Sequence, residues 1–115
     1  MTPEALRNLI VDALEDRKGR DVVAVDVAEV SDVTDYMIIA SGTSDRHVKS
    51  LVDQVVEAAT TAGVKPLGVE GRESREWVLV DMGDALVHVM QSETRTFYEL
   101  ERLWAELPAD AETGV

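Results

Sequence analysis

The chain contains one short segment whose residue types suit phosphate binding, SGTSDRH at residues 41–47. A glycine-containing turn between a strand and a helix is where many proteins hold phosphate groups. The Walker and dinucleotide patterns both require further glycines, and the Walker pattern also requires a lysine, which this segment lacks. A structural role explains it better. Gly42 permits a tight exit from a strand. Thr43 or Ser44 can cap the next helix, and Asp45 complements its dipole.

Carboxylates spaced for metal chemistry are the second candidate. Nucleotidyltransferases place two metal-binding carboxylates as D-x-D, because alternate residues of a strand share one face. Here Asp81 and Asp84 are spaced D-x-x-D across a predicted turn, and Asp32 and Asp35 show the same spacing in a predicted loop. The catalytic carboxylate pair is therefore missing, and we expect no metal and no cofactor. A metal-dependent nucleotidyltransferase-like enzyme stays an open alternative.

Cysteine and histidine usage narrows the chemistry further. The chain has no cysteine, which excludes disulfides, thiolate zinc sites and thiol nucleophiles. Ser41 and Ser44 lack the G-x-S-x-G elbow of serine hydrolases. His47 lies one turn into a predicted helix, as a surface residue, and His88 lies on a predicted strand, where a hydrogen-bonded structural role is expected. These features favour a protein that is not an enzyme.

Length and charge set broad limits. A chain of 115 residues fits a single domain with a modest core. With 23 acidic and 11 basic side chains, its net charge of −12 disfavours direct binding to DNA and suits a basic protein partner. No apolar run approaches the roughly 20 residues of a membrane span. The acidic, amphipathic N-terminus is unlike a signal peptide. We therefore predict a cytoplasmic protein that does not enter a membrane.

Hydrophobic periodicity predicts an α/β (α+β) fold, a single domain with a mixed β-sheet flanked by helices in the order α-β-β-α-β-β-β-α. The strand at 36–40 is apolar throughout and is expected in the sheet interior, whereas Pro66 places the strand at 64–69 near an edge. The domain is predicted at 1–107, followed by a disordered acidic tail at 108–115. The remaining predicted elements are helices at 3–18, 45–62 and 93–106, a strand at 21–30 and a hairpin at 76–91.

The hairpin carries the most informative pattern, because its turn determines which side chains share a face. A two-residue turn at Gly83 and Asp84 sets Met82 opposite Ala85. Alternation then assigns one apolar set to the core: Val78, Val80, Met82, Ala85, Val87 and Val89. The other face shows Trp77, Leu79, Asp81, Leu86, His88 and Met90, which is unusually apolar for a solvated sheet. This face is covered by the last helix, covered by a second copy of the chain, or a docking surface for another protein.

Three blocks of the sequence resemble the Iojap family, the bacterial ribosomal silencing factors. They are DYMIIASGTSDRHV at 35–48, EWVLVDMGDALVHVM at 76–90 and TFYELERLW at 96–104, and they occur in the family's order. The resemblance covers about residues 5–106. It implies a small mixed-sheet fold related in shape to nucleotidyltransferases but without their chemistry.

The resemblance also implies a function. Family members bind large-subunit ribosomal protein fourteen on the joining face of the large ribosomal subunit. They sterically block the small subunit, so translation falls when nutrients are scarce, and isolated members often form homodimers. By this resemblance, Trp77 and Leu79 are anchors of the partner-binding surface. Leu86, His88 and Met90 extend it, and Asp81 and Asp84 face basic side chains of the partner. A homodimeric adaptor with no ribosomal role remains a further alternative.

Overall fold

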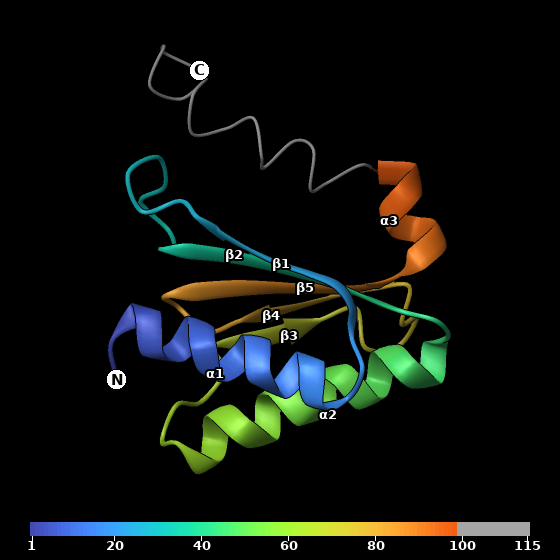
Figure 1. Ribbon diagram of the computed structural model, residues 1–115, viewed down its shortest axis with the longest axis horizontal. Helices are drawn as coiled ribbons and strands as arrows, with labels where there is room; N and C mark the ends of the chain where they lie inside the picture. The colour runs from blue at the N-terminus through green and yellow to red at the C-terminus, as the bar shows by residue number, and fades with distance from the viewer. Residues whose placement is uncertain (99–115) are drawn as a thin grey trace.

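The computed structural model of the chain describes residues 1–98, and the side chains up to residue 95. The elements follow the predicted order α-β-β-α-β-β-β-α (Figure 1). The helices are α1 (Pro3–Asp16), α2 (Asp45–Thr61) and α3 (Ser92–Tyr98). The strands are β1 (Arg20–Asp26), β2 (Tyr36–Gly42), β3 (Gly68–Glu70), β4 (Trp77–Asp81) and β5 (Ala85–Gln91). The predicted α/β fold with one mixed sheet is confirmed.

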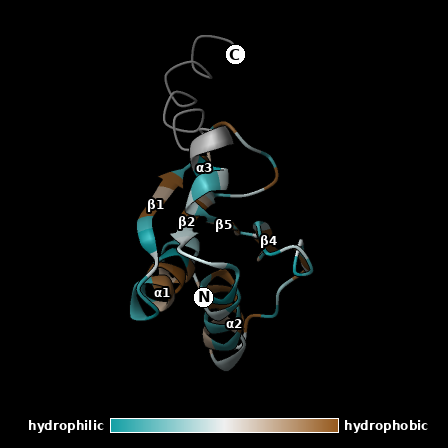
Figure 2. Ribbon diagram, turned by 90° about the vertical axis from the view of Figure 1, so that its right-hand side faces the viewer, coloured by the Kyte–Doolittle hydropathy of each residue, from teal (hydrophilic) through white to brown (hydrophobic). Residues whose placement is uncertain are grey.

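The five strands form one sheet in the order β1-β2-β5-β4-β3. The pair β2–β5 is parallel and the other three pairs are antiparallel. The sheet is therefore mixed, with β2 in its interior and β3 at an edge, as the sequence predicts. Seen from the end of the sheet in Figure 2, α1 and α2 lie on one side and α3 lies on the other.

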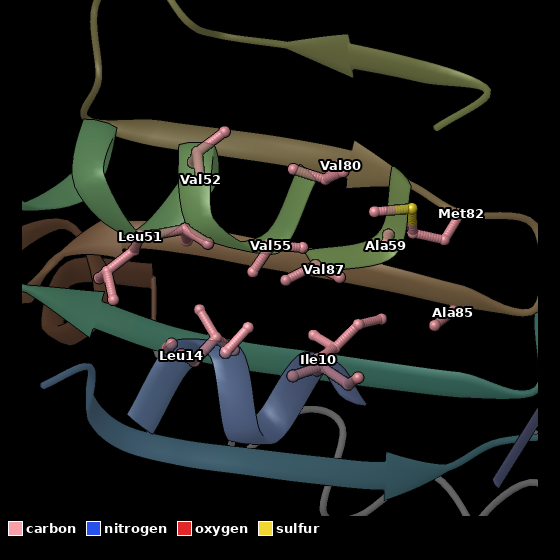
Figure 3. Close-up of a cluster of buried hydrophobic side chains, with 14 of the residues drawn as sticks. Ile10, Leu14, Leu51, Val52, Val55, Ala59, Val80, Met82, Ala85 and Val87 are labelled. Atoms are coloured by element: carbon pink, nitrogen blue, oxygen red, sulfur yellow. The ribbon is translucent and has the colours of Figure 1, made fainter. Parts of the chain in front are cut away.

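The main hydrophobic core lies between the sheet and the two long helices (Figure 3). Each helix contributes one apolar stripe at helical spacing, because only one face of an amphipathic helix can be buried against the sheet. The stripe of α1 is Leu6, Ile10, Ala13 and Leu14, and that of α2 is Val48, Leu51, Val52, Val55 and Ala59. The hairpin supplies the predicted set, Val78, Val80, Met82, Ala85, Val87 and Val89, all of which are buried in this core.

The segment SGTSDRH joins β2 to α2 and has the structural role that the sequence favours. Ser44 is the N-cap of α2, and its side chain accepts a hydrogen bond from the backbone N–H of His47 at 3.1 Å. A Cβ on Gly42 would lie 2.9 Å from Val48 Cγ2 and 3.0 Å from the Val48 backbone nitrogen. Gly42 is therefore needed because the first turn of α2 passes close to the end of β2.

His47 differs from the prediction of a simple surface residue, since it is half-buried and joins two helices. Its Nδ1 accepts a hydrogen bond from the backbone N–H of Thr43 at 2.9 Å. The neutral ring must then carry its proton on Nε2, which lies 2.9 Å from the carbonyl oxygen of Arg17. The ring thus ties the start of α2 to the end of α1.

Two strands differ in length from the prediction for local reasons. The first strand ends at Asp26 rather than at residue 30, because Asp26 Oδ1 accepts a hydrogen bond from the backbone N–H of Ala28 and turns the chain. The edge strand begins at Gly68 rather than at residue 64. The Val64 N–H donates to the Ala59 carbonyl at the end of α2, and Pro66 has no N–H to donate.

Most of the predicted C-terminal part lies outside the described residues. The helix predicted at 93–106 is described only as α3, and the predicted boundary between a domain at 1–107 and a tail at 108–115 lies outside the described residues. Among residues 1–98, no helix combines the length and the apolar character needed to cross a membrane.

The close approach at Gly42 predicts a specific sensitivity to an added methyl group. Gly42→Ala should lower the free energy of unfolding by about 1–3 kcal/mol, because the new Cβ overlaps the buried Val48. Gly68→Ala is the matched control, since its added Cβ meets no atom within 4 Å. Urea unfolding of both variants measures the difference, and equal midpoints for the two would contradict the account.

Candidate partner-binding face

The turn of the β4–β5 hairpin has the predicted two-residue form. Met82 lies opposite Ala85, and its N–H donates to the Ala85 carbonyl at 2.9 Å. Gly83 has a φ of +82°, a conformation that favours glycine, and its N–H donates to Asp81 Oδ1 at 2.9 Å. The register continues along the strands to Trp77 opposite Met90. The assignment of side chains to the two faces of the hairpin is therefore confirmed.

The sheet face opposite α1 and α2, which we call the outer face, extends beyond the hairpin. Across the parallel pair β2–β5, Met37 lies beside Leu86 and Ile39 beside His88. Across β1–β2, Val25 lies beside Met37 and Val23 beside Ile39. These four residues are absent from the site predicted from the sequence, because they join the hairpin only through strand pairing between distant segments. The outer face thus carries Val23, Val25, Met37, Ile39, Ser41, Trp77, Leu79, Asp81, Leu86, His88 and Met90.

The predicted binding residues differ in how far solvent reaches them. Trp77, Leu79, Asp81 and Leu86 are half-buried, and Asp84 is exposed in the turn. Met90 is 0% exposed and His88 is 8% exposed, so these two are buried rather than presented to a partner. The sequence pattern places them on the correct face but cannot show this burial. The accessible part of the predicted surface is therefore the first four residues with Asp84.

One end of the outer face is covered by α3, which packs against β5 and β2. Arg95 of α3 is 3% exposed, and its guanidinium donates to Ser41 Oγ at 2.9 Å. A charge at such depth requires polar partners, because desolvation of an ion is costly. The start of the last helix thus covers part of this face. Cover by the last helix is one of the three explanations considered for this face.

Trp77 and His88 form a polar contact across the two strands of the hairpin. The indole Nε1–H donates to His88 Nδ1 at 3.0 Å, and the two ring centroids are 5.9 Å apart. Because Nδ1 accepts this bond, the neutral imidazole carries its proton on Nε2. Burial lowers the pKa of His88 from 6.5 to about 4. The histidine is therefore neutral at physiological pH, and it orients the Trp77 ring on the outer face.

The residues considered for enzymatic chemistry are used structurally. Asp81 accepts the hydrogen bond of the turn, and Asp84 lies in that turn. The hydroxyls of Ser41 and Ser44 take part in the Arg95 contact and in the helix cap. Over the part of the chain that the structure describes, no three His, Cys, Asp or Glu side chains are grouped closely enough to hold a metal ion.

The buried histidine predicts a pH-dependent stability. Because the pKa of His88 is lower in the folded protein, the unfolded chain binds the proton more readily below pH 6.5. Folding stability should therefore fall as the pH drops from 6.5 towards 4, by up to about 3 kcal/mol from this group. Urea unfolding at about pH 7 and about pH 5 measures this decrease.

His88→Gln serves as the control for this prediction, because an amide oxygen can still accept the Trp77 hydrogen bond but does not titrate. The decrease in stability between the two pH values should be smaller in the variant. An identical decrease in both proteins would show that the acid sensitivity comes from other groups.

Comparison with known proteins assigns the chain to a family. The model of the family described as "Ribosomal silencing factor during starvation" matches residues 1–114. Ribosomal silencing factor RsfS of Haemophilus influenzae is 42% identical over 101 residues, which cover 88% of this chain and 99% of that protein. A Chromobacterium violaceum crystal structure has 43% sequence identity and a TM-score of 0.88, covering 91% of this chain and 88% of that chain.

A more distant relative extends the comparison to mitochondria. Mouse "mitochondrial assembly of ribosomal large subunit protein 1" is 34% identical over 100 residues, which cover 84% of this chain and 44% of that longer protein. The sequence blocks that resemble Iojap proteins, the family model and the structural similarity all agree. The chain belongs to the ribosomal silencing factor family, the bacterial branch of the Iojap proteins.

Proposed function

We propose that this protein binds the large ribosomal subunit and sterically blocks its joining to the small subunit, which represses translation under nutrient limitation. The partner on the large subunit is large-subunit ribosomal protein fourteen. The family description names ribosomal silencing during starvation, and the name of the mouse relative refers to the large ribosomal subunit. The mechanism is occlusion, so it needs no catalytic group and no cofactor, and it takes place in the cytoplasm where subunits join.

The observation that carries the proposal is the chemistry of the outer face. Trp77, Leu79 and Leu86 form a half-buried apolar strip on adjacent strands, where Leu79 lies opposite His88 and Asp81 opposite Leu86. Aromatic and aliphatic anchors beside charged residues are typical of binding hot spots. Asp81 and Asp84 place two carboxylates at one end of this strip, which suits a basic ribosomal protein. The buried His88 and Met90 support the strip from within the sheet.

Homodimer formation is compatible with this proposal. A second copy of the chain can cover the same apolar strip when no ribosome is available, which keeps the strip from water. Binding to the subunit then requires the dimer to open. The alternative is that the strip serves only self-association, in which case the protein would be a homodimeric adaptor with no ribosomal role.

Truncation of one anchor side chain should weaken binding to the large subunit while the protein still folds. Leu79→Ala should weaken binding to purified large subunits by about tenfold or more, since a central apolar anchor contributes over 1 kcal/mol. Leu9→Ala is the matched control, because Leu9 is also half-buried but lies on α1, on the other side of the sheet. Co-sedimentation at increasing protein concentration measures both affinities, and circular dichroism checks that both variants fold.

The same assay tests the proposal as a whole. The wild-type protein should co-sediment with large subunits but not with intact ribosomes, because the small subunit and the protein compete for one surface. It should also lower the yield of intact ribosomes formed from mixed subunits. If the folded wild-type protein does not bind large subunits, the proposed function is wrong.

A further inference from the structure

The basic side chains of this acidic chain are gathered in one region. Five of the 11 Lys and Arg residues line two adjoining hollows of about 220 and 280 Å³, which share Lys49. They come from the end of α1, the first turns of α2 and the loop between β3 and β4. We call these residues the basic cluster: Arg17, Arg46, Lys49, Arg72 and Arg75.

The smaller hollow has a cationic wall and an apolar floor. Its lining consists of Lys49, Arg72 and Arg75 around the buried Val52 and Val78, and no carboxylate of the described residues lines it. The side chains of the three cations are between 37% and 50% exposed. An open hollow of this kind can take one small anionic group, whose oxygens would meet cations on several sides.

Most hydrogen-bond donors of the cluster are not used within the described residues. Lys49 Nζ lies 2.6 Å from one oxygen of Asp53, and an Arg72 nitrogen lies 3.1 Å from the other. The hydrogen bond from Lys49, followed by the contact with Arg72, lowers the pKa of Asp53. Since an ammonium has three N–H donors and a guanidinium five, each of these cations retains donors for a ligand.

Two further members of the cluster are less constrained. Arg46 is exposed and makes no ion pair or side-chain hydrogen bond with any residue in the described range 1–98. Arg75 lies 4.0 Å from Asp45, which is too long for a hydrogen bond. Within that range, only Asp45, Asp53 and Glu57 line the hollows or pair with the cluster, so five positive charges face three negative ones.

The hairpin links the basic cluster to the acidic turn. Arg75 precedes β4, and its carbonyl accepts a hydrogen bond from the side chain of Gln91, the last residue of β5. Asp84 precedes the first residue of β5. A strand of seven residues is about 23 Å long, so opposite charges lie at the two ends of the hairpin. The molecule can thus present carboxylates to a basic protein and cations to a nearby anion.

We propose that the basic cluster binds phosphate groups in the RNA of the large ribosomal subunit. This inference rests on the proposed function, because the cluster, which lies at the rim of the sheet on the side of α2, meets ribosomal RNA only when the protein is bound to the large subunit. The total charge of −12 opposes approach to an RNA surface. A local cluster of Lys and Arg can still attract phosphate groups despite this net charge. Such contacts would fix the orientation of the bound protein.

The double variant Arg46→Gln with Arg75→Gln tests the proposal and leaves the hydrogen bonds of Asp53 intact. Its affinity for purified large subunits should fall by roughly tenfold at moderate salt. The slope of log affinity against log salt concentration is negative, and it should become smaller in magnitude by about 1 for each phosphate that the variant no longer binds. Lys65→Gln is a control for the removal of a positive charge, since Lys65 lies beyond the other end of α2 and is exposed.

Binding of the same variants to isolated large-subunit ribosomal protein fourteen identifies the source of any effect. The double variant should bind this protein as well as the wild type does. Unchanged affinity for large subunits would overturn the phosphate assignment while leaving the proposed function intact. Equally weakened binding to the isolated protein and to the subunit would also overturn it, since the cluster would then contact protein. If the wild-type protein binds no large subunit, the proposed function and this inference fail together.

Discussion

A two-residue turn at Gly83 and Asp84 determines which side chains of the hairpin face the helices and which face away. The positive φ of Gly83 and the hydrogen bond from its N–H to Asp81 fix this turn. A shift of one residue between the two strands would reverse the faces of β4, moving Val78 and Val80 out of the core and placing Trp77 and Leu79 within it. The packing of α1 and α2 and the apolar character of the outer face both depend on this register.

Local patterns in the sequence contain much of this information. The turn residues and the alternation along the hairpin predict both of its faces, and the cap expected at Thr43 or Ser44 marks where α2 begins. Strand ends are harder to predict, because one hydrogen bond from the backbone N–H of Ala28 to the Asp26 carboxylate stops a valine-rich strand early. Local chemistry thus outweighs strand propensity at that position.

Contacts between distant segments could not be predicted from the sequence. The parallel pairing of β2 with β5 brings Met37 beside Leu86, and no local pattern predicts this. The burial of Met90 and His88 also depends on tertiary packing, so both remain in the candidate site as supporting residues rather than contact residues. The distribution of charge also depends on the fold. Composition gives only the net charge of −12, whereas folding gathers five cations beside α2.

On the proposed function, the outer face of the sheet becomes buried when the protein binds the large subunit. The chain has no cysteine, so Leu86→Cys creates a single site for an environment-sensitive fluorophore on that face. Large subunits should shift its emission to shorter wavelength, while the same label at Thr61→Cys, exposed in α2 on the other side of the sheet, should change little. An unchanged spectrum at residue 86 under conditions where the labelled protein co-sediments with large subunits would contradict the account.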